Sequence, residues 1–214
     1  ITIIARGTDQ IFVQSRRDHY VGYVPTSALG PATKPTHQIT ARSSHAYRDP
    51  DFKSPTRTVL SFGSGVEAGQ INGRFLGTEL GYIPLEHISE IGAKHDPVAL
   101  AEQFLGTPYL WGGNSAWGID CSGLVQSVMA ASGQSCPRDS DMQSDEFGTF
   151  LISSAHRKRG DLIFWPGHVG ILRDENTLLH ANATHMCVAS EPLDHAIERI
   201  GQQEFGAVIG YKRP

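Results

Sequence analysis

The sequence lacks the features that usually direct a protein to nucleic acid or to a lipid bilayer. Its 214 residues hold 18 Lys and Arg against 22 Asp and Glu, a formal net charge of −4. Binding to nucleic acid or to an anionic membrane normally needs a basic surface, and no apolar run here approaches membrane-spanning length. We therefore expect neither nucleic acid nor a membrane as a partner.

Cysteine is also scarce, and its count is odd. A disulfide between Cys136 and Cys187 would leave Cys121 unpaired, and three cysteines suit a reducing compartment better than an oxidising one. No Cys-x-x-Cys or His-x-x-x-His spacing supports a zinc centre, so no metal or other cofactor is expected. The expected localisation is cytoplasmic, with a periplasmic or secreted role as the alternative.

What the chain does contain is a cysteine at the start of an apolar helix. Asp120-Cys121-Ser122-Gly123 precedes apolar residues at the spacing of one helical face, and Gly133 supplies a stop. Asp120 is a suitable N-cap, and the helix N-terminus is expected to favour the thiolate of Cys121 over the thiol. The local alternative is a small, inert, buried cysteine.

Two histidines downstream offer a base for this thiol. Gly160 to Trp165, His168 to Leu172 and Thr177 to Asn182 read as strands separated by turns. If even-numbered positions pair with even-numbered ones, His168 and His180 share one face as opposite or diagonal neighbours. His168 would then move the thiol proton, and His180 would orient its ring. Ordinary solvated or packed histidines are the alternative.

The order of the motifs from about residue 93 to the end resembles the NlpC/P60 family of cysteine peptidases. The resemblance rests on six segments in the family's order: Pro108 to Gly113, Asp120 to Gly123, Arg138 to Gln143, Gly160 to Phe164, His168 to Ile171 and Leu179 to Ala181. It implies an α+β, papain-like domain in which Cys121, His168 and His180 are catalytic. It also implies that Tyr109 helps hold the site or the oxyanion, although a packed aromatic is the plainer interpretation.

The family usually cleaves the bond between the γ-carboxyl of D-glutamate and a diamino acid in murein stem peptides, which are thus the expected partners. An amidase, an acyltransferase or an open-cleft endopeptidase on the same core is the nearest alternative. A non-catalytic wall-binding protein is the rival from another class. The oligomeric state stays open, with a monomer as the expectation.

An internal repeat precedes this region. Gly22-Tyr23-Val24-Pro25 returns 59 residues later as Gly81-Tyr82-Ile83-Pro84, a spacing that suits small β-barrels. Both copies resemble the last strand of bacterial SH3-like (SH3b) domains. The predicted organisation is a first SH3b domain over 1–30, a linker over 31–38, a second SH3b domain over 39–92 and the peptidase domain over 93–214.

The first predicted barrel is short, because a closed small barrel needs about five or six strands. The chain opens without Met, so we expect N-terminal strands of this barrel to lie outside the sequence. In relatives with two SH3b domains the first one walls off the cleft, and only peptides with a free N-terminal L-alanine enter. By resemblance Asp120, Ser122 and Tyr20 would then bind the substrate, and Asp120 would pair with the ammonium group of its L-alanine. The alternative for Asp120 is a purely structural role as the N-cap.

Overall fold

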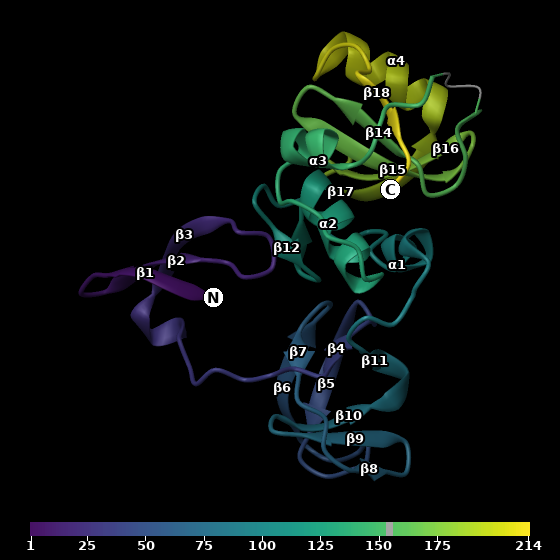
Figure 1. Cartoon of the computed structure of the whole chain (residues 1–214). Coiled ribbons are helices and arrows are strands. Elements are labelled where there is room, and N and C mark those ends of the chain that lie inside the picture. The colour runs from purple at the N-terminus through teal and green to yellow at the C-terminus, as the bar shows by residue number, and fades with distance from the viewer. Residues whose placement is uncertain (153–155) are drawn as a thin grey trace.

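A five-stranded antiparallel sheet forms the centre of the C-terminal unit. The computed structural model describes residues 1–152 and 156–214, and Figure 1 shows three successive units. The strand order in the C-terminal sheet is β17-β16-β15-β14-β18. The bounds are β14 Leu162–Trp165, β15 His168–Asp174, β16 Thr177–Asn182, β17 Cys187–Pro192 and β18 Gly210–Lys212. The three strands predicted around the histidines are thus present.

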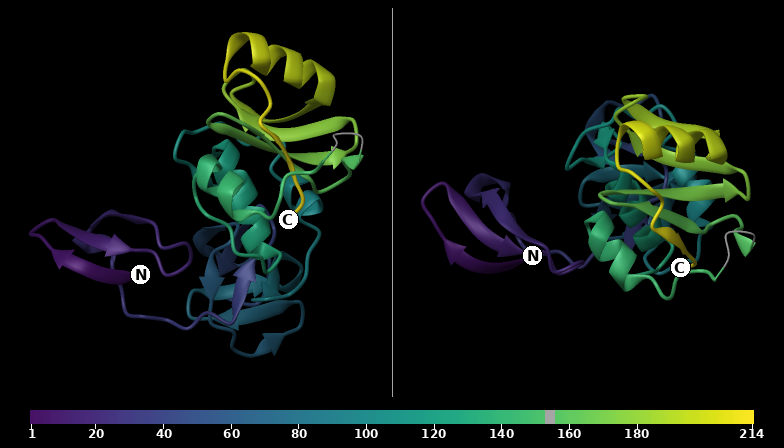
Figure 2. Two further views of the ribbon diagram at one scale, coloured as in Figure 1. Left: turned by 45° about the horizontal axis from the view of Figure 1, so that its top comes forward. Right: turned by 90° about the horizontal axis from the view of Figure 1, so that it is seen from above.

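Alternating apolar residues give this sheet two buried faces. Leu162 and Phe164 of β14 pack with the helices α1 and α2, whereas Ile163 and Trp165 pack with α4. Figure 2 shows α4, in yellow, over one face of the sheet and the earlier helices against the other. The helices are α1 Pro97–Glu102, α2 Cys121–Ala131, α3 Ser140–Glu146 and α4 Leu193–Gln203. A strand with both faces covered reads as a continuous apolar run, as β14 does.

Capping explains where the first two helices begin. The side chain of Asp96 accepts a hydrogen bond from Val98 N, and that of Asp120 accepts one from Gly123 N, as the sequence predicted for Asp120. After the first helix, Phe104 N and Leu105 N bond to carbonyls three residues back and form a tighter last turn. The second ends before Gly133, whose φ of +81° suits glycine.

Residues 37–90 form a second unit of short strands. One sheet has the order β6-β5-β10-β9-β8 and the other β11-β4-β7. The bounds are β4 His37–Ile39, β5 Ser43–Tyr47, β6 Thr56–Ser61, β7 Gly65–Val66, β8 Ile71–Asn72, β9 Phe75–Thr78, β10 Gly81–Pro84 and β11 Ile88–Glu90. Strand β4 begins at His37, so the last two residues of the predicted linker belong to this strand.

The first unit is an open three-stranded sheet in the order β1-β2-β3. It stands to one side of the molecule and is joined to the second unit by an extended segment (Figure 1). Its strands are β1 Thr2–Arg6, β2 Gln10–Gln14 and β3 Val21–Pro25. Only Ile11 and Val13 are buried among its apolar side chains. The sheet does not close into a barrel, so the SH3-like assignment of this unit stays a prediction.

The internal repeat has the same local structure in both copies. Pro25 ends β3 and precedes a 3₁₀ helix, η1 (Thr26–Ala28), and Pro84 ends β10 and precedes η2 (Leu85–His87). The two prolines have φ of −57° and −58°, with ψ of 138° and 132°. The repeat therefore extends to backbone conformation, which supports the prediction that the two units are related.

Candidate active site

Cys121 lies in the first turn of α2 and is 8% exposed. Burial raises the pKa of Cys121 to about 11, although backbone N–H groups of Val169 and of the helix start lower it in part. The N–H groups of the helix start thus act in the predicted direction, but they do not offset the effect of burial on the pKa of Cys121. Desolvation of a buried thiol outweighs the few N–H dipoles that face it.

His168 and His180 lie on one face of the sheet, as the sequence predicted. Leu172 pairs with Leu178, so Gly170 lies opposite His180. His168 is therefore the diagonal neighbour of His180. The ring nitrogens His168 Nε2 and His180 Nδ1 are 2.8 Å apart. His180 thus contacts His168 in the way an orienting residue would.

Aromatic side chains hold the ring of His168. Phe205 stacks on it with ring centroids 5.1 Å apart and planes 1° from parallel, and Trp165 lies at 5.6 Å. Burial, and then the neighbouring His180, hold the pKa of His168 well below its ordinary value of 6.5. Burial also lowers the pKa of His180. The resting pair is therefore neutral at physiological pH.

Cys121 lies beside the first peptide of β15. Val169, the residue after His168, shares a core cluster with Cys121, and its backbone lowers the pKa of the thiol. Strand alternation directs the side chain of His168 to the opposite face, beside Phe205. Among the described residues the His168 ring forms its hydrogen bond with His180 and not with Cys121. Catalytic contacts of this kind often tighten only when substrate binds.

Two further residues extend the histidine pair, and the sequence did not point to them. Glu191 Oε1 is 2.8 Å from His180 Nε2 and 2.5 Å from Arg199 Nη2. Burial opposes ionisation of Glu191, but its bonds to His180 and Arg199 bring its pKa down to about 2. No local sequence pattern marks either residue. Glu191 lies in β17 and Arg199 lies in α4.

Asp120 is held by four strong donors as well as capping α2. Its Oδ1 accepts from Gly123 N at 2.7 Å and its Oδ2 from Gly112 N at 2.8 Å. Arg138 forks onto both oxygens at 3.0 and 2.8 Å. The cap predicted from sequence is confirmed, whereas Arg138 was missed because it lies eighteen positions away. The carboxylate is 4% exposed, so an incoming ammonium group would share it with these partners.

Ser122 and Tyr109 surround the same helix start. Ser122 Oγ accepts from Arg138 Nη1 at 2.9 Å and donates to Asp120 Oδ1 at 3.4 Å. Tyr109 is half-buried against the core that contains Cys121. Burial raises the pKa of Tyr109, and the charges of Cys121 and Asp120 raise it further. Its hydroxyl is therefore a neutral donor near the thiol.

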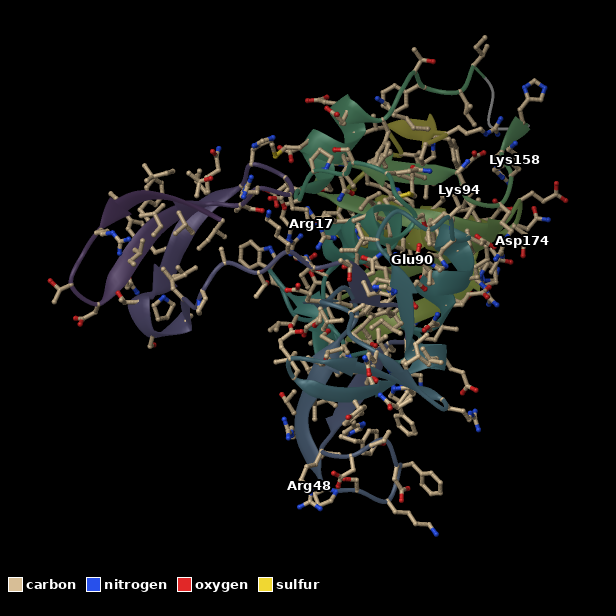
Figure 3. All side chains as sticks on the ribbon, turned by 60° about the horizontal axis from the view of Figure 1, so that its bottom comes forward. Arg17, Arg48, Glu90, Lys94, Lys158 and Asp174 are labelled. Atoms are coloured by element: carbon tan, nitrogen blue, oxygen red, sulfur yellow. The ribbon has the colours of Figure 1, made fainter. Side chains whose placement is uncertain are left out.

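The first unit reaches this region through the loop between β2 and β3. Gln126 of α2 donates to Asp18 Oδ2 at 2.8 Å, and Arg17, labelled in Figure 3, marks the junction. Asp139 raises the pKa of Tyr20 by its charge and by a hydrogen bond to the hydroxyl. A cleft of about 1020 Å³ is lined by both units, with Tyr20 and Asp120 among its walls. The structure thus brings Tyr20 to the same cleft as Asp120, whereas Cys121, His168 and His180 are not among the residues that line it.

Comparison with known proteins identifies the C-terminal unit. The model of the NlpC/P60 family matches residues 106–200, which include the cysteine and both histidines. These residues belong to the NlpC/P60 family. The family predicted from the six motifs is therefore confirmed.

Relatives of the NlpC/P60 domain include two curated peptidases. The chain is 31% identical over 110 residues to a gamma-D-glutamyl-L-lysine dipeptidyl-peptidase of Bacillus cereus, covering 48% of this chain and 32% of that protein. It is 32% identical over 136 residues to dipeptidyl-peptidase 6 of Lysinibacillus sphaericus, covering 63% and 48%. The matched part therefore spans about a third to a half of the length of these relatives.

A solved structure extends the likeness beyond the NlpC/P60 domain. The crystal structure of an NlpC/P60 family protein from Bacillus cereus superposes with a TM-score of 0.81, over 99% of this chain and 78% of that one. At 21% identity this likeness concerns the fold alone. All three units of the chain are covered, and the α+β class is confirmed.

Neither a metal site nor a disulfide is found in the part of the chain that the structure describes. No group of three or more His, Cys, Asp or Glu side chains there could hold a metal ion. Cys121, Cys136 and Cys187 are all free, so the alternative disulfide is not formed. In the same ranges, no helix combines the length and the apolar character needed to cross a bilayer.

Proposed function

We propose that the chain is a cysteine peptidase that hydrolyses the γ-D-glutamyl–diamino acid bond of murein stem peptides. The observation that carries this proposal is that one NlpC/P60 domain contains both Cys121 at a helix start and the bonded pair His168 and His180. The name of one relative, a gamma-D-glutamyl-L-lysine dipeptidyl-peptidase, supports the same bond.

In the first step the Cys121 sulfur attacks the amide carbonyl while His168 takes the thiol proton. The backbone N–H of Cys121, free of a helical partner at this position, faces the developing oxyanion together with the Tyr109 hydroxyl. His168 then gives the proton to the leaving amine, and a thioester of Cys121 remains. Water, deprotonated by His168, hydrolyses the thioester and restores the thiol.

We further propose that the substrate needs a free N-terminal L-alanine and that L-Ala-γ-D-Glu is the product. The β2–β3 loop supports this, because Asp18 accepts a hydrogen bond from Gln126 of α2 and Tyr20 lines the cleft together with Asp120. A carboxylate that lines this cleft selects for an ammonium group, since a blocked amine would leave it poorly paired. The three free thiols suit a reducing compartment, so we place this activity in the cytoplasm, with a periplasmic or secreted role as the alternative.

One observation favours a second candidate, an endopeptidase with an open cleft. Asp120 already accepts from two backbone N–H groups and from both nitrogens of the Arg138 fork. Because protein donors already occupy both oxygens of this carboxylate, its main role would be to cap α2 and not to bind substrate. In that case N-blocked peptides would bind as well as free ones.

A digest followed by mass spectrometry separates these functions. The substrates are free L-Ala-γ-D-Glu-diamino-acid tripeptide, its N-acetylated form and intact murein, and the control is Cys121→Ala. We expect L-Ala-γ-D-Glu from the free tripeptide alone. Cleavage of all three substrates would establish the open-cleft endopeptidase, and cleavage of none would overturn the proposed function.

A further inference from the structure

Three neighbouring strands carry a continuous line of polar side chains. His168 on β15, His180 on β16 and Glu191 on β17 are joined by two hydrogen bonds of 2.8 Å each. Leu178 pairs with Glu191, so Glu191 lies diagonally across from His180 on the same face. Arg199 of α4 closes the line from the other side of Glu191.

The ionised carboxylate of Glu191 determines which atom donates in each of these hydrogen bonds. An ionised carboxylate can only accept hydrogen bonds, so His180 must donate to Glu191 from Nε2. A neutral His180 then has a lone pair on Nδ1, and this nitrogen must accept from His168 Nε2. The proton of His168 is thereby placed on Nε2. Its other nitrogen, Nδ1, is left unprotonated and is the one that can take a proton from Cys121.

We propose that Glu191, held in place by Arg199, is a positioning residue that sets the tautomers of both histidines and so makes His168 Nδ1 the base. The kinetic part of this inference rests on the proposed peptidase function, whereas the tautomers do not. Glu191 touches neither the thiol nor the proposed substrate. It acts only through His180.

Burial makes the tautomers depend on this one contact. His168 is 2% exposed and His180 is fully buried, so bulk water does not supply alternative partners to their ring nitrogens. Glu191 itself is kept ionised and fixed, because Arg199 also bonds to Thr184 Oγ1 at 2.9 Å and to Glu204. A merely structural role, in which Glu191 only ties β17 to α4, would predict lower stability on its removal but unchanged tautomers.

The direct test is NMR of the histidine side chains in the whole protein, where ring carbon and nitrogen shifts distinguish the two tautomers. In the unmodified protein we expect the proton on Nε2 in both His168 and His180. In Glu191→Leu we expect mixed tautomers. In Glu191→Gln the side-chain carbonyl can still accept from His180 and Arg199, so the tautomers are retained. A His180 protonated on Nδ1 in the unmodified protein would overturn the proposal.

Steady-state kinetics provide a second test of the proposal. We expect kcat to fall about 10- to 100-fold in Glu191→Leu and less in Glu191→Gln, with KM changed no more than about twofold. The matched control is Glu102→Gln, which removes a carboxylate from Arg173 on the other face of the sheet and should leave kcat unchanged. An unaltered kcat and unaltered tautomers in Glu191→Leu would overturn the proposal.

Failure of the proposed function would not obscure this test. If the unmodified protein cleaves no wall peptide, the rate at which iodoacetamide alkylates Cys121 replaces kcat, read on the Cys121 peptide by mass spectrometry. We expect the same order of variants, with Glu191→Leu slowest. Should Glu191→Leu fail to fold, the tautomers of the unmodified protein decide the matter, and a His180 protonated on Nδ1 would contradict the proposal.

Discussion

The Cys121 thiol and the His168 imidazole are both held in their neutral forms by burial, which raises the pKa of the first and lowers that of the second. These two directions favour a neutral resting pair, and we expect the proton to move during attack on the substrate. Such a site relies on the base being free of protons rather than on a preformed nucleophile.

This state of His168 predicts how the activity depends on pH. Because its pKa lies well below 6.5, His168 stays unprotonated, and so competent as a base, as the pH falls through 6.5. We expect the acid limb of kcat/KM below pH 6.5, in a profile measured on the tripeptide from about pH 4.5 to about pH 9.5. An acid limb centred above 6.5 would show that the histidine behaves as a hydrated or anion-paired residue.

At the scale of single elements, the β15–β16 pair packs closely at His180. Gly170 stands beside His180, and a Cβ at Gly170 would meet Leu178 Cδ1 at 2.5 Å and His180 Cβ at 3.2 Å. A side chain there cannot be accommodated without moving β16. Glycine in this strand therefore leaves room for the side chains of Leu178 and His180 on the neighbouring strand.

The variant Gly170→Ala tests this packing. Overpacking should lower the free energy of unfolding by about 1–3 kcal/mol, measured by urea denaturation. Displacement of His180 should lower kcat by more than about tenfold, because small misplacements of catalytic groups are costly. The control is Gly30→Ala, where a Cβ meets nothing within 4 Å. Wild-type kcat in a destabilised Gly170→Ala protein would contradict the positional argument.

The elements also show how far sequence reasoning reaches. Alternation and turn residues were enough to predict β14, β15 and β16 and the shared face of His168 and His180, because these signals are local. The raised pKa of Cys121 could not be predicted, since it depends on how completely the rest of the chain covers the thiol. Glu191 and Arg138 were missed for the same reason, as each finds its partner only through tertiary packing.

At the scale of the whole molecule, the first unit contributes to the cleft through the start of the chain, β2, β3 and the loop between these two strands. That loop is anchored to α2 by Asp18, and Tyr20 faces Asp139 across the cleft. The second unit lies between the two in sequence, yet none of its residues lines this cleft. Selection of the substrate's N-terminus is thus expected to depend on the first unit and the NlpC/P60 domain together.

The variant Tyr20→Ala tests this dependence. Opening the wall of the cleft should reduce the preference for the free over the N-acetylated tripeptide by about tenfold, equivalent to about 1.4 kcal/mol. The ratio of the two kcat/KM values is the measurement. Phe52→Ala serves as a control, because this aromatic residue is 71% exposed on the second unit. An unchanged ratio in Tyr20→Ala would place the selection elsewhere.

The line of His168, His180 and Glu191 crosses three strands, and each contact in it requires the register that the sheet has. A slip of β16 by one residue would turn His180 to the opposite face and break both hydrogen bonds at once. Only molecules with the correct strand pairing can therefore turn over substrate. Specific activity therefore reports whether the strands of the sheet have paired in the correct register.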